Sequence, residues 1–228
     1  MNVCIIPARG GSKRIPKKNI KYFCGDPIIK YSIDAAKKSN LFDYIIVSTD
    51  DLEIAKISEE IGAEVPFVRP QNISDDNSGI KDVMIHAIKY LQDNATELDK
   101  ICCLLPTAPL VEINDIKKGE ICLDKVEKDK FVFAATKFNF PIQRGFSLEN
   151  NLAFPIDLNF TKKRSQDLKE YFHDAGQFYW GYKEAWFSKK NFFEESMPIL
   201  LPSWRVQDLD TIEDWERAEL IYKIIYKL

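Results

Sequence analysis

Short apolar runs alternate with longer amphipathic segments along most of this chain, and this alternation restricts the fold more than any other feature of the sequence. The apolar runs are typical of buried strands and lie at residues 2–6, 44–48, 64–68, 101–105 and 131–136. The segments between them carry apolar residues three and four positions apart, which predicts helices over 27–38, 52–61, 80–92 and about 113–125. Such a chain is expected to form an α/β fold, a mostly parallel sheet with helices on both faces.

The alternation stops near residue 137, where the chain becomes rich in Phe, Asn and Pro. We expect an insertion at about 137–182, which ends in a strand over 176–181. A final strand over 204–209 and a helix over 211–227 are predicted to follow it. Residues 1–228 are therefore expected to form a single domain that carries one insertion.

Composition argues against several classes of function. The net charge of −3 gives no global attraction to nucleic acid or to an anionic membrane, and no apolar run of about 18 residues is present. The five cysteines show no CxxC spacing, and the two histidines complete no zinc pattern with them. The apolar run at 3–6 is too short for a signal peptide, so we expect a reduced, cytoplasmic protein with no membrane or nucleic-acid partner.

The loop after the first predicted strand concentrates positive charge. Residues 1–25 contain six Lys and Arg residues but no Asp or Glu. Gly10 and Gly11 allow the backbone to approach a ligand closely, and Arg9, Ser12 and Lys13 supply donors that suit a triphosphate. Because ligands of parallel sheets bind beyond the carboxyl ends of the strands, the pattern favours a phosphate site over a solvated basic loop.

Near the other end of the chain, two aspartates stand two positions apart. On a strand, Asp208 and Asp210 would project from the same face with Leu209 turned toward the core. Paired carboxylates are ligands that Mg²⁺ prefers. The segment from Asp210 to Asp214 equally has the pattern of a helix N-cap with a capping box, and the two roles can coexist.

The motif from Pro7 to Asn19, PARGGSKRIPKKN, resembles the N-terminal motif of the acylneuraminate cytidylyltransferases. The segments VSTD at 47–50, RP at 69–70 and LPTAP at 105–109 resemble later motifs of that family in the same order. The resemblance extends through essentially the whole chain. It implies a Rossmann-like nucleotidyltransferase core of the GT-A-like type, with CTP as a substrate and magnesium as a cofactor. It also implies a homodimer in which the insertion supplies contacts and helps to close the neighbouring subunit's site.

The resemblance also implies roles for individual residues. Those expected to hold the nucleotide are Arg9, Gly10, Gly11, Ser12, Lys13, Asn19, Arg69, Ser78 and Thr107, with Arg9 and Lys13 at the reacting phosphates and Asn19 at the cytosine. Asp208 and Asp210 would hold the metal, and Asp210 would be essential for turnover. Those expected to contact the acceptor sugar are Arg164, His173, Gln177, Tyr179, Phe192 and Phe193. Arg164 suits a sugar carboxylate, since a guanidinium can hold one with two hydrogen bonds.

The sequence departs from the sialic acid enzymes of the family at two places. Leu105 stands where those enzymes carry Gln, and the run DAGQF at 174–178 replaces their Asn-Gly pattern. Together with PIQR at 141–144, this run resembles the pseudaminic acid cytidylyltransferases, which serve flagellin and surface glycans in bacteria. The implied reaction is transfer of CMP from CTP to the anomeric hydroxyl of a nine-carbon acidic sugar, with release of pyrophosphate.

Several alternatives stay open at this point. Within the same class, the acceptor could be sialic acid, legionaminic acid or Kdo. A GT-A-type glycosyltransferase would also use a nucleotide and an Asp-x-Asp site, but would release no pyrophosphate. A non-catalytic nucleotide-binding protein would bind CTP without forming a product. His173 could be structural, the Phe192–Phe193 pair could belong to the core, and at least one of Asp50 and Asp51 is expected to cap the following helix.

Overall fold

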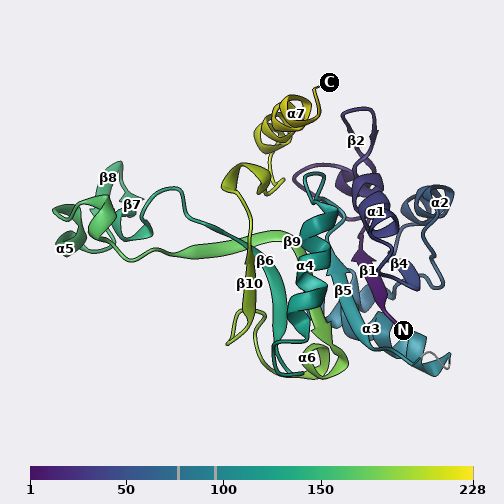
Figure 1. Ribbon diagram of the computed structural model, residues 1–228. Helices are drawn as coiled ribbons and strands as arrows, with labels where there is room; N and C mark the ends of the chain where they lie inside the picture. The colour runs from purple at the N-terminus through teal and green to yellow at the C-terminus, as the bar shows by residue number, and fades with distance from the viewer. Residues whose placement is uncertain (76–77, 95–96, 228) are drawn as a thin grey trace.

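The computed structural model describes residues 1–75, 78–94 and 97–227. Its centre is a six-stranded sheet in the order β10-β6-β9-β5-β1-β4 (Figure 1). The strands are β1 (Val3–Pro7), β4 (Tyr44–Ser48), β5 (Lys100–Leu104), β6 (Phe131–Lys137), β9 (Phe172–Tyr182) and β10 (Met197–Leu200). Only β9 runs antiparallel to its two neighbours among these strands, so the expected mostly parallel sheet is confirmed.

Helices cover both faces of this sheet, because the strand side chains alternate between two apolar clusters. The covering helices are α1 (Ile28–Ser39), α2 (Leu52–Ile61), α3 (Ile80–Asp93), α4 (Ile113–Leu123) and α6 (Lys183–Phe187), and α7 (Ile212–Tyr226) lies apart from them. Cys4 and Ile6 of β1 face α1, α2 and α4, whereas Val3 and Ile5 face α3 and α6. All five cysteines are free, and those of β1 and β5 are buried.

A third apolar cluster lies outside the two main ones and holds α7 in place. Ile15, Phe23, Leu209 and Trp215 are all buried in it, and the rings of Phe23 and Trp215 meet edge to face at 5.6 Å. Phe23 belongs to the small hairpin of β2 (Tyr22–Phe23) and β3 (Asp26–Pro27). This satellite cluster therefore ties the chain after the basic loop to the segment before α7.

Two predicted strands are wrong. Residues 64–68 make only isolated bridges, to Ile46 of β4 and to Thr49 just after it, since Pro66 cannot donate to a ladder. Residues 204–209 form no strand: a 3-10 turn over Ser203–Arg205 leads into irregular chain, and β10 occupies the sheet edge instead. Arg205 and Leu209 are buried but Gln207 between them is only half-buried, whereas a strand packed on the core would bury all three on one face.

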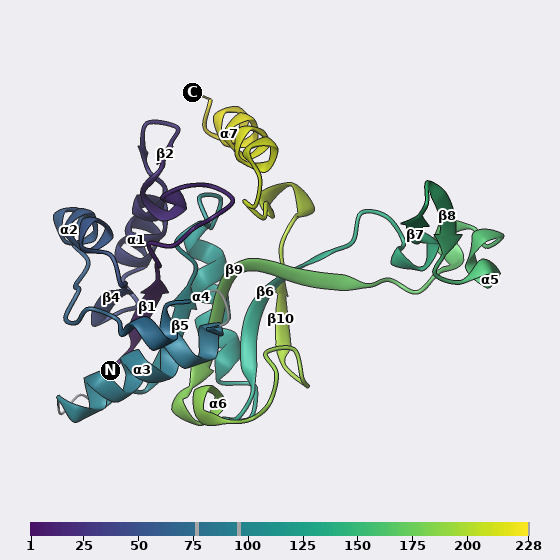
Figure 2. The same cartoon turned by 180° about the vertical axis from the view of Figure 1, so that it is seen from behind.

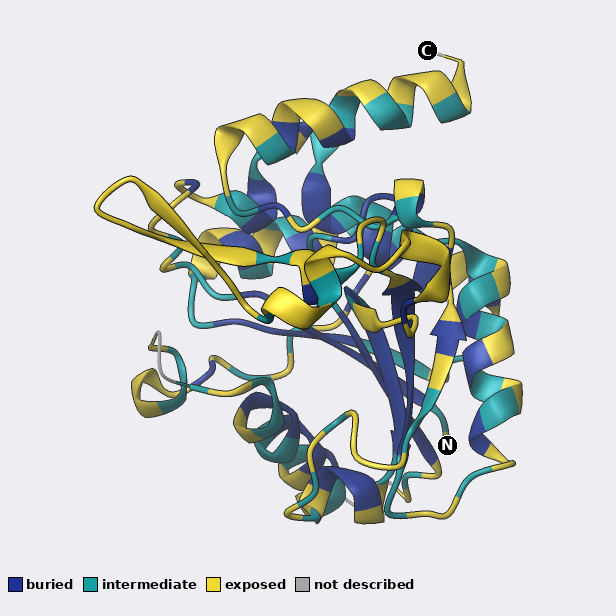
Figure 3. Cartoon of the chain, turned by 90° about the vertical axis from the view of Figure 1, so that its left-hand side faces the viewer, coloured by how far each residue is buried: buried dark blue, intermediate teal, exposed yellow. Residues whose placement is uncertain are grey.

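Between β6 and β9 the chain leaves the sheet as a long arm (Figures 1 and 2). The arm, residues 138–171, carries the hairpin of β7 (Phe146–Glu149) and β8 (Leu152–Pro155) and the short helix α5 (Leu158–Thr161). Every residue of β7 and β8 is exposed, in contrast to the buried central strands that Figure 3 shows in dark blue. Within the described residues, no helix combines the length and the apolar character that crossing a bilayer requires.

Candidate active site

A cavity of about 620 Å³ lies at the carboxyl ends of β1 and β5. It receives residues from the basic loop, from the chain around α3 and from the loop after β5, as parallel sheets arrange their ligand sites. Seven of the nine residues predicted to hold a nucleotide line it: Arg9, Ser12, Lys13, Asn19, Arg69, Ser78 and Thr107. Gly10 and Gly11 belong to the same loop. The structure thus gathers the predicted set, although its nucleotide-binding role stays a prediction.

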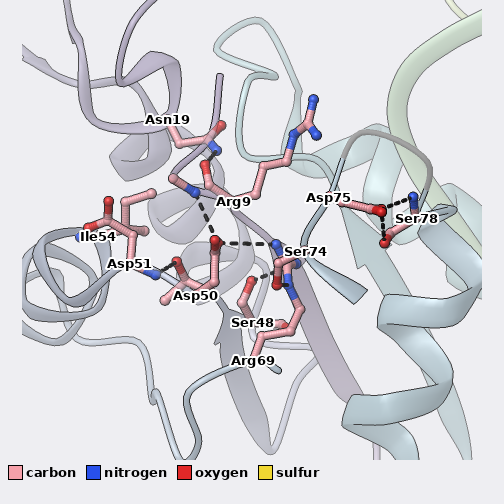
Figure 4. Close-up of polar contacts among 12 residues, drawn as sticks. Arg9, Asn19, Ser48, Asp50, Asp51, Ile54, Arg69, Ser74, Asp75 and Ser78 are labelled. Atoms are coloured by element: carbon pink, nitrogen blue, oxygen red, sulfur yellow. Dashed lines mark hydrogen bonds and ion pairs between the residues drawn. The ribbon is translucent and has the colours of Figure 1, made fainter. Parts of the chain in front are cut away.

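Asp50, two residues after the end of β4, holds the basic loop against Arg69 (Figure 4). Its Oδ1 accepts a hydrogen bond from Gly10 N–H at 3.0 Å and lies 3.5 Å from Arg69 Nη2. Arg69 is only 4% exposed and also donates to the Ser48 carbonyl and to Ser74 Oγ. Burial lowers the pKa of Arg69, and the charge of Asp50 opposes that shift. Gly10 N–H is therefore used within the protein rather than available to a phosphate.

Asp51, the next residue, has the other role that was expected for this pair. Its side chain accepts from the backbone N–H groups of Glu53 and Ile54 at 2.8 and 3.1 Å and caps α2. The predicted cap at Asp50 or Asp51 is confirmed. Asp51 caps α2, and Asp50 positions the basic loop.

The two glycines of the loop differ in the space around them, which makes a matched pair of substitutions. A Cβ on Gly10 would lie 2.6 Å from Asp51 Oδ2 and 2.9 Å from Asp51 Cβ, whereas a Cβ on Gly11 would meet nothing within 4 Å. We expect Gly10→Ala to lower stability by about 1–3 kcal/mol, as overpacking does, and Gly11→Ala to leave it unchanged. Thermal melting checks this. Equal melting temperatures for the two variants would contradict the close approach at Gly10.

The aspartate pair contacts the basic loop, although Arg14 and Asp210 lie 196 positions apart in the sequence. Arg14 Nη1 donates to Asp210 Oδ2 at 2.7 Å, and Lys18 Nζ donates to the Leu209 carbonyl at 2.7 Å. Lys18 Nζ also lies 3.6 Å from Asp210 Oδ1. The satellite cluster explains the meeting, because Ile15 and Leu209 are buried in it together.

Asp208 and Asp210 lie on irregular chain rather than on the predicted strand, yet Leu209 between them still turns inward. Neither aspartate caps α7: Thr211 does so and completes a capping box with Asp214. The capping box predicted for this segment is confirmed, and it leaves the pair available for another role.

Asp208 faces a second recess, of about 390 Å³, which is also lined by Thr136, Asn139, His173 and Gln207. Crowding by the surrounding protein and, after it, the negative charge of Asp210 raise the pKa of Asp208. Lys18 and Arg14 oppose the shift but do not cancel it. A carboxylate whose ionised form is disfavoured by a neighbouring carboxylate is a suitable place for a cation.

The donors present fit a magnesium ion with an incomplete set of protein ligands. Among the described residues, no group of three or more His, Cys, Asp or Glu gathers as a metal site would require. Mg²⁺ commonly binds through one or two carboxylates and takes its other ligands from substrate phosphates and water. Asp208, which lines the second recess, and Asp210, which contacts two cations that line the first, match that pattern.

The residues predicted to contact the sugar are not gathered in one place. His173 lines the recess of Asp208, and its ring packs on Phe138 at 4.6 Å. Tyr179 is buried, and its hydroxyl donates to the carboxylate of Asp174. Burial and the charge of Asp174 raise the pKa of Tyr179 far above its usual range, so its hydroxyl stays protonated.

Gln177 and Phe192 contact other residues of the protein and Phe193 is 51% exposed, and the sugar-binding role of all three stays a prediction. Gln177 is buried and donates to the Arg205 carbonyl. Phe192 packs against Phe131, Tyr179 and Trp186, and Phe193 against Phe133. None of the three is among the residues that line the 620 Å³ cavity.

Arg164 stands apart from all of these residues, on the arm. Its side chain is 73% exposed and pairs with Asp167 three positions later. Figures 1 and 2 both show the arm extending away from the sheet. Arg164 is not among the residues that line the 620 Å³ cavity of its own chain.

Arg14 and Lys18 line the cavity but were absent from the predicted site. The signal that could have found them is the uninterrupted positive charge of residues 1–25, which was noted for the loop as a whole. What the sequence could not show is that these two cations contact the aspartate pair.

Comparison with known proteins gives a consistent result. The family model described as "Cytidylyltransferase" matches residues 3–223. A pseudaminic acid cytidylyltransferase of Campylobacter jejuni is 47% identical over 98% of this chain and 97% of its own length. A CMP-N,N'-diacetyllegionaminic acid synthase of Legionella pneumophila is 29% identical over 97% of this chain and 96% of its own. Among solved structures, a CMP:2-keto-3-deoxy-manno-octonic acid synthetase in complex with CTP has a TM-score of 0.69 at 15% identity and covers 100% of this chain and 99% of its own, a likeness of fold alone.

Proposed function

The chain belongs to the cytidylyltransferase family, and we propose that it transfers CMP from CTP to the anomeric hydroxyl of pseudaminic acid, with release of pyrophosphate. The observation that carries this proposal is the contact between the basic loop, whose Arg14 lines the nucleotide cavity, and the aspartate pair, through Arg14 and Asp210. The relative at 47% identity supports the choice of acceptor, because it spans nearly the whole of both chains. Leu105, which lines the cavity, supports an acceptor other than common sialic acid.

The chemistry is an in-line attack of the sugar hydroxyl on the α-phosphorus of CTP. Arg9 and Lys13 would hold the phosphates from the loop side and stabilise the charge of the departing pyrophosphate. Arg69 and Ser78 would line the nucleotide from the opposite wall of the cavity. Because little covalent chemistry falls to the protein, positioning and charge stabilisation supply most of the acceleration.

We propose Mg²⁺ as the cofactor, held by Asp208 and Asp210. When bound there, the metal would neutralise phosphate charge and lower the pKa of the attacking hydroxyl. Since Asp208 faces the recess of His173 while Arg14 and Lys18 line the nucleotide cavity, we place the sugar acid on the Asp208 side.

We further propose that the protein acts as a homodimer. The arm exposes large apolar side chains with no core of its own to receive them, among them Phe140, Phe146, Leu148, Leu152, Ile156 and Leu158. Exposed apolar groups gathered on a projecting hairpin are typical of an interface. A second copy that covers the arm would bring Arg164 to a cavity other than that of its own chain.

An assay of each nucleoside triphosphate against a panel of sugar acids tests the reaction. The panel contains pseudaminic acid, legionaminic acid, sialic acid and Kdo, and products are identified by mass together with pyrophosphate. Of the nucleoside triphosphates, we expect CTP alone to react, and to form CMP-pseudaminic acid with an equal amount of pyrophosphate. Preference for another acid would overturn the acceptor, and glycosyl transfer without pyrophosphate would favour a glycosyltransferase. Binding of CTP with no product from any acid would favour a non-catalytic protein.

A further inference from the structure

The segment that carries the aspartate pair is anchored by a buried arginine rather than by a strand ladder. Arg205 precedes Asp208 by three positions and is only 7% exposed. Its guanidinium donates to Asp115 in the first turn of α4 and lies 3.3 Å from Glu112, the N-cap residue of that helix. A buried guanidinium held by two carboxylates is confined in position, and so is the backbone that carries it.

Gln177 of β9 connects this anchored segment to a wall of the nucleotide cavity. Its side-chain Nε2 donates to the Arg205 carbonyl at 2.9 Å. Its backbone carbonyl accepts from Leu105 N–H at 2.8 Å. Leu105 begins the loop that carries Thr107, and both residues line the cavity. One residue therefore bonds both to the loop that contacts the proposed nucleotide and to the segment that carries the proposed metal ligands.

The side-chain oxygen of Gln177 indicates that a contribution to stability alone does not account for a glutamine at this position. Gln177 is 3% exposed, and its Oε1 has no hydrogen-bond partner among the described residues. An unsatisfied buried acceptor costs free energy, and this cost offsets what the bond from Nε2 contributes. An apolar residue of the same shape would avoid the cost.

We propose that Gln177 and Arg205 are positioning residues which fix the aspartate pair relative to the nucleotide cavity, and so set how well the protein binds its metal. The inference rests on the proposed function, since it assumes that Asp208 and Asp210 hold that metal. It replaces the expectation that Gln177 contacts the sugar.

Gln177→Met tests the pair, because it keeps the shape, deletes the donor and also removes the unsatisfied oxygen. We expect a melting temperature close to that of the unsubstituted protein. Mn²⁺ affinity in the presence of CTP, measured by water-proton relaxation without any sugar, should fall about fivefold or more. The Mg²⁺ concentration for half-maximal rate should rise in proportion, while the KM for the sugar acid stays unchanged.

Gln143→Met is the matched control. Gln143 is also buried, donates through Nε2 to a backbone carbonyl at 2.8 Å and leaves Oε1 without a partner in the described chain, but it lies on the arm. The Mn²⁺ affinity of the Gln143→Met variant should equal that of the unsubstituted protein. Arg205→Lys should reproduce the metal defect of Gln177→Met, since a lysine side chain is shorter and does not place its ammonium where Arg205 Nη1 contacts both carboxylates.

Two outcomes would overturn the inference. Unchanged Mn²⁺ affinity in Gln177→Met would remove the positioning role, and a raised KM for the sugar acid with normal metal dependence would make Gln177 a sugar contact instead. Because the relaxation measurement needs no turnover, it succeeds or fails independently of which acceptor the enzyme uses.

Discussion

Asp210→Asn is expected to lower kcat by about a thousandfold or more, because it removes one of the two carboxylates proposed to hold the metal at the reacting phosphates. The fold should persist. Asp210 is partly exposed and caps no helix, and exposed ion pairs such as that with Arg14 contribute little to stability. Steady-state kinetics with saturating CTP and thermal melting measure the two effects separately.

Binding of CTP in the presence of EDTA distinguishes the metal role from a structural one. If Asp210 acts through the metal, Asp210→Asn should bind CTP without metal at least as well as the unsubstituted protein, because Arg14 and Lys18 lose a competing anion. If Asp210 acts only by holding the basic loop through those two cations, CTP binding without metal should be lost. Near-normal turnover would contradict both roles.

Thr211→Ala is the control for changes at the start of α7. Thr211 is the N-cap residue, and its hydroxyl accepts from Asp214 N–H at 3.2 Å. Loss of such a cap costs about 1 kcal/mol, which for a domain of this size lowers the melting temperature by about 2–4 °C. Activity at 25 °C should remain. The adjacent variants thus separate chemistry at Asp210 from helix capping at Thr211.

Local patterns in the sequence predicted the elements whose conformation is decided locally. The bounds predicted for β4 and α2 agree with the structure, since one is a continuous apolar run and the other begins at a capping aspartate and ends before Gly62. The resemblance to acylneuraminate cytidylyltransferases is likewise confirmed by the family match and by relatives that span the chain. It rested on motifs in the loops at the carboxyl ends of strands, which carry function in folds of this kind.

The parts that were not predicted depend on contacts between distant residues. The segment at 204–209 has strand-like composition, but its conformation is decided by Arg205 bonding to Asp115 and by Leu209 entering the satellite cluster. Gln177 lies on the same strand as His173 and Tyr179, which were predicted to contact the sugar. Nothing in this part of the sequence indicates that its side-chain amide donates to the Arg205 carbonyl. Periodicity carries no information about such pairs, because their partners lie 28 to 90 positions away.

The second large effect is expected at Arg164, which lies on the arm and away from the cavity of its own chain. Arg164→Ala should lower the rate about thirtyfold or more if its guanidinium holds the sugar carboxylate of the neighbouring subunit. Its present pair with Asp167 is exposed, so the guanidinium can exchange that partner at little cost. Lys162→Ala, which removes another exposed cation of the arm, should keep normal activity and control for a general effect of charge.

Mixing two inactive variants tests whether Arg164 acts across the proposed dimer. In a heterodimer of Arg164→Ala with Asp210→Asn, the cavity that keeps Asp210 receives the arm that keeps Arg164, so one of its two sites is complete. Random assembly of equal amounts should restore about a quarter of normal activity in a symmetric dimer. Co-expression with two affinity tags isolates the heterodimer itself, which should have about half of normal activity. An inactive heterodimer would show that Arg164 serves the cavity of its own chain. If the protein remains monomeric in sedimentation experiments, Arg164 does not act across a dimer. The exposed apolar side chains of the arm would then need another explanation.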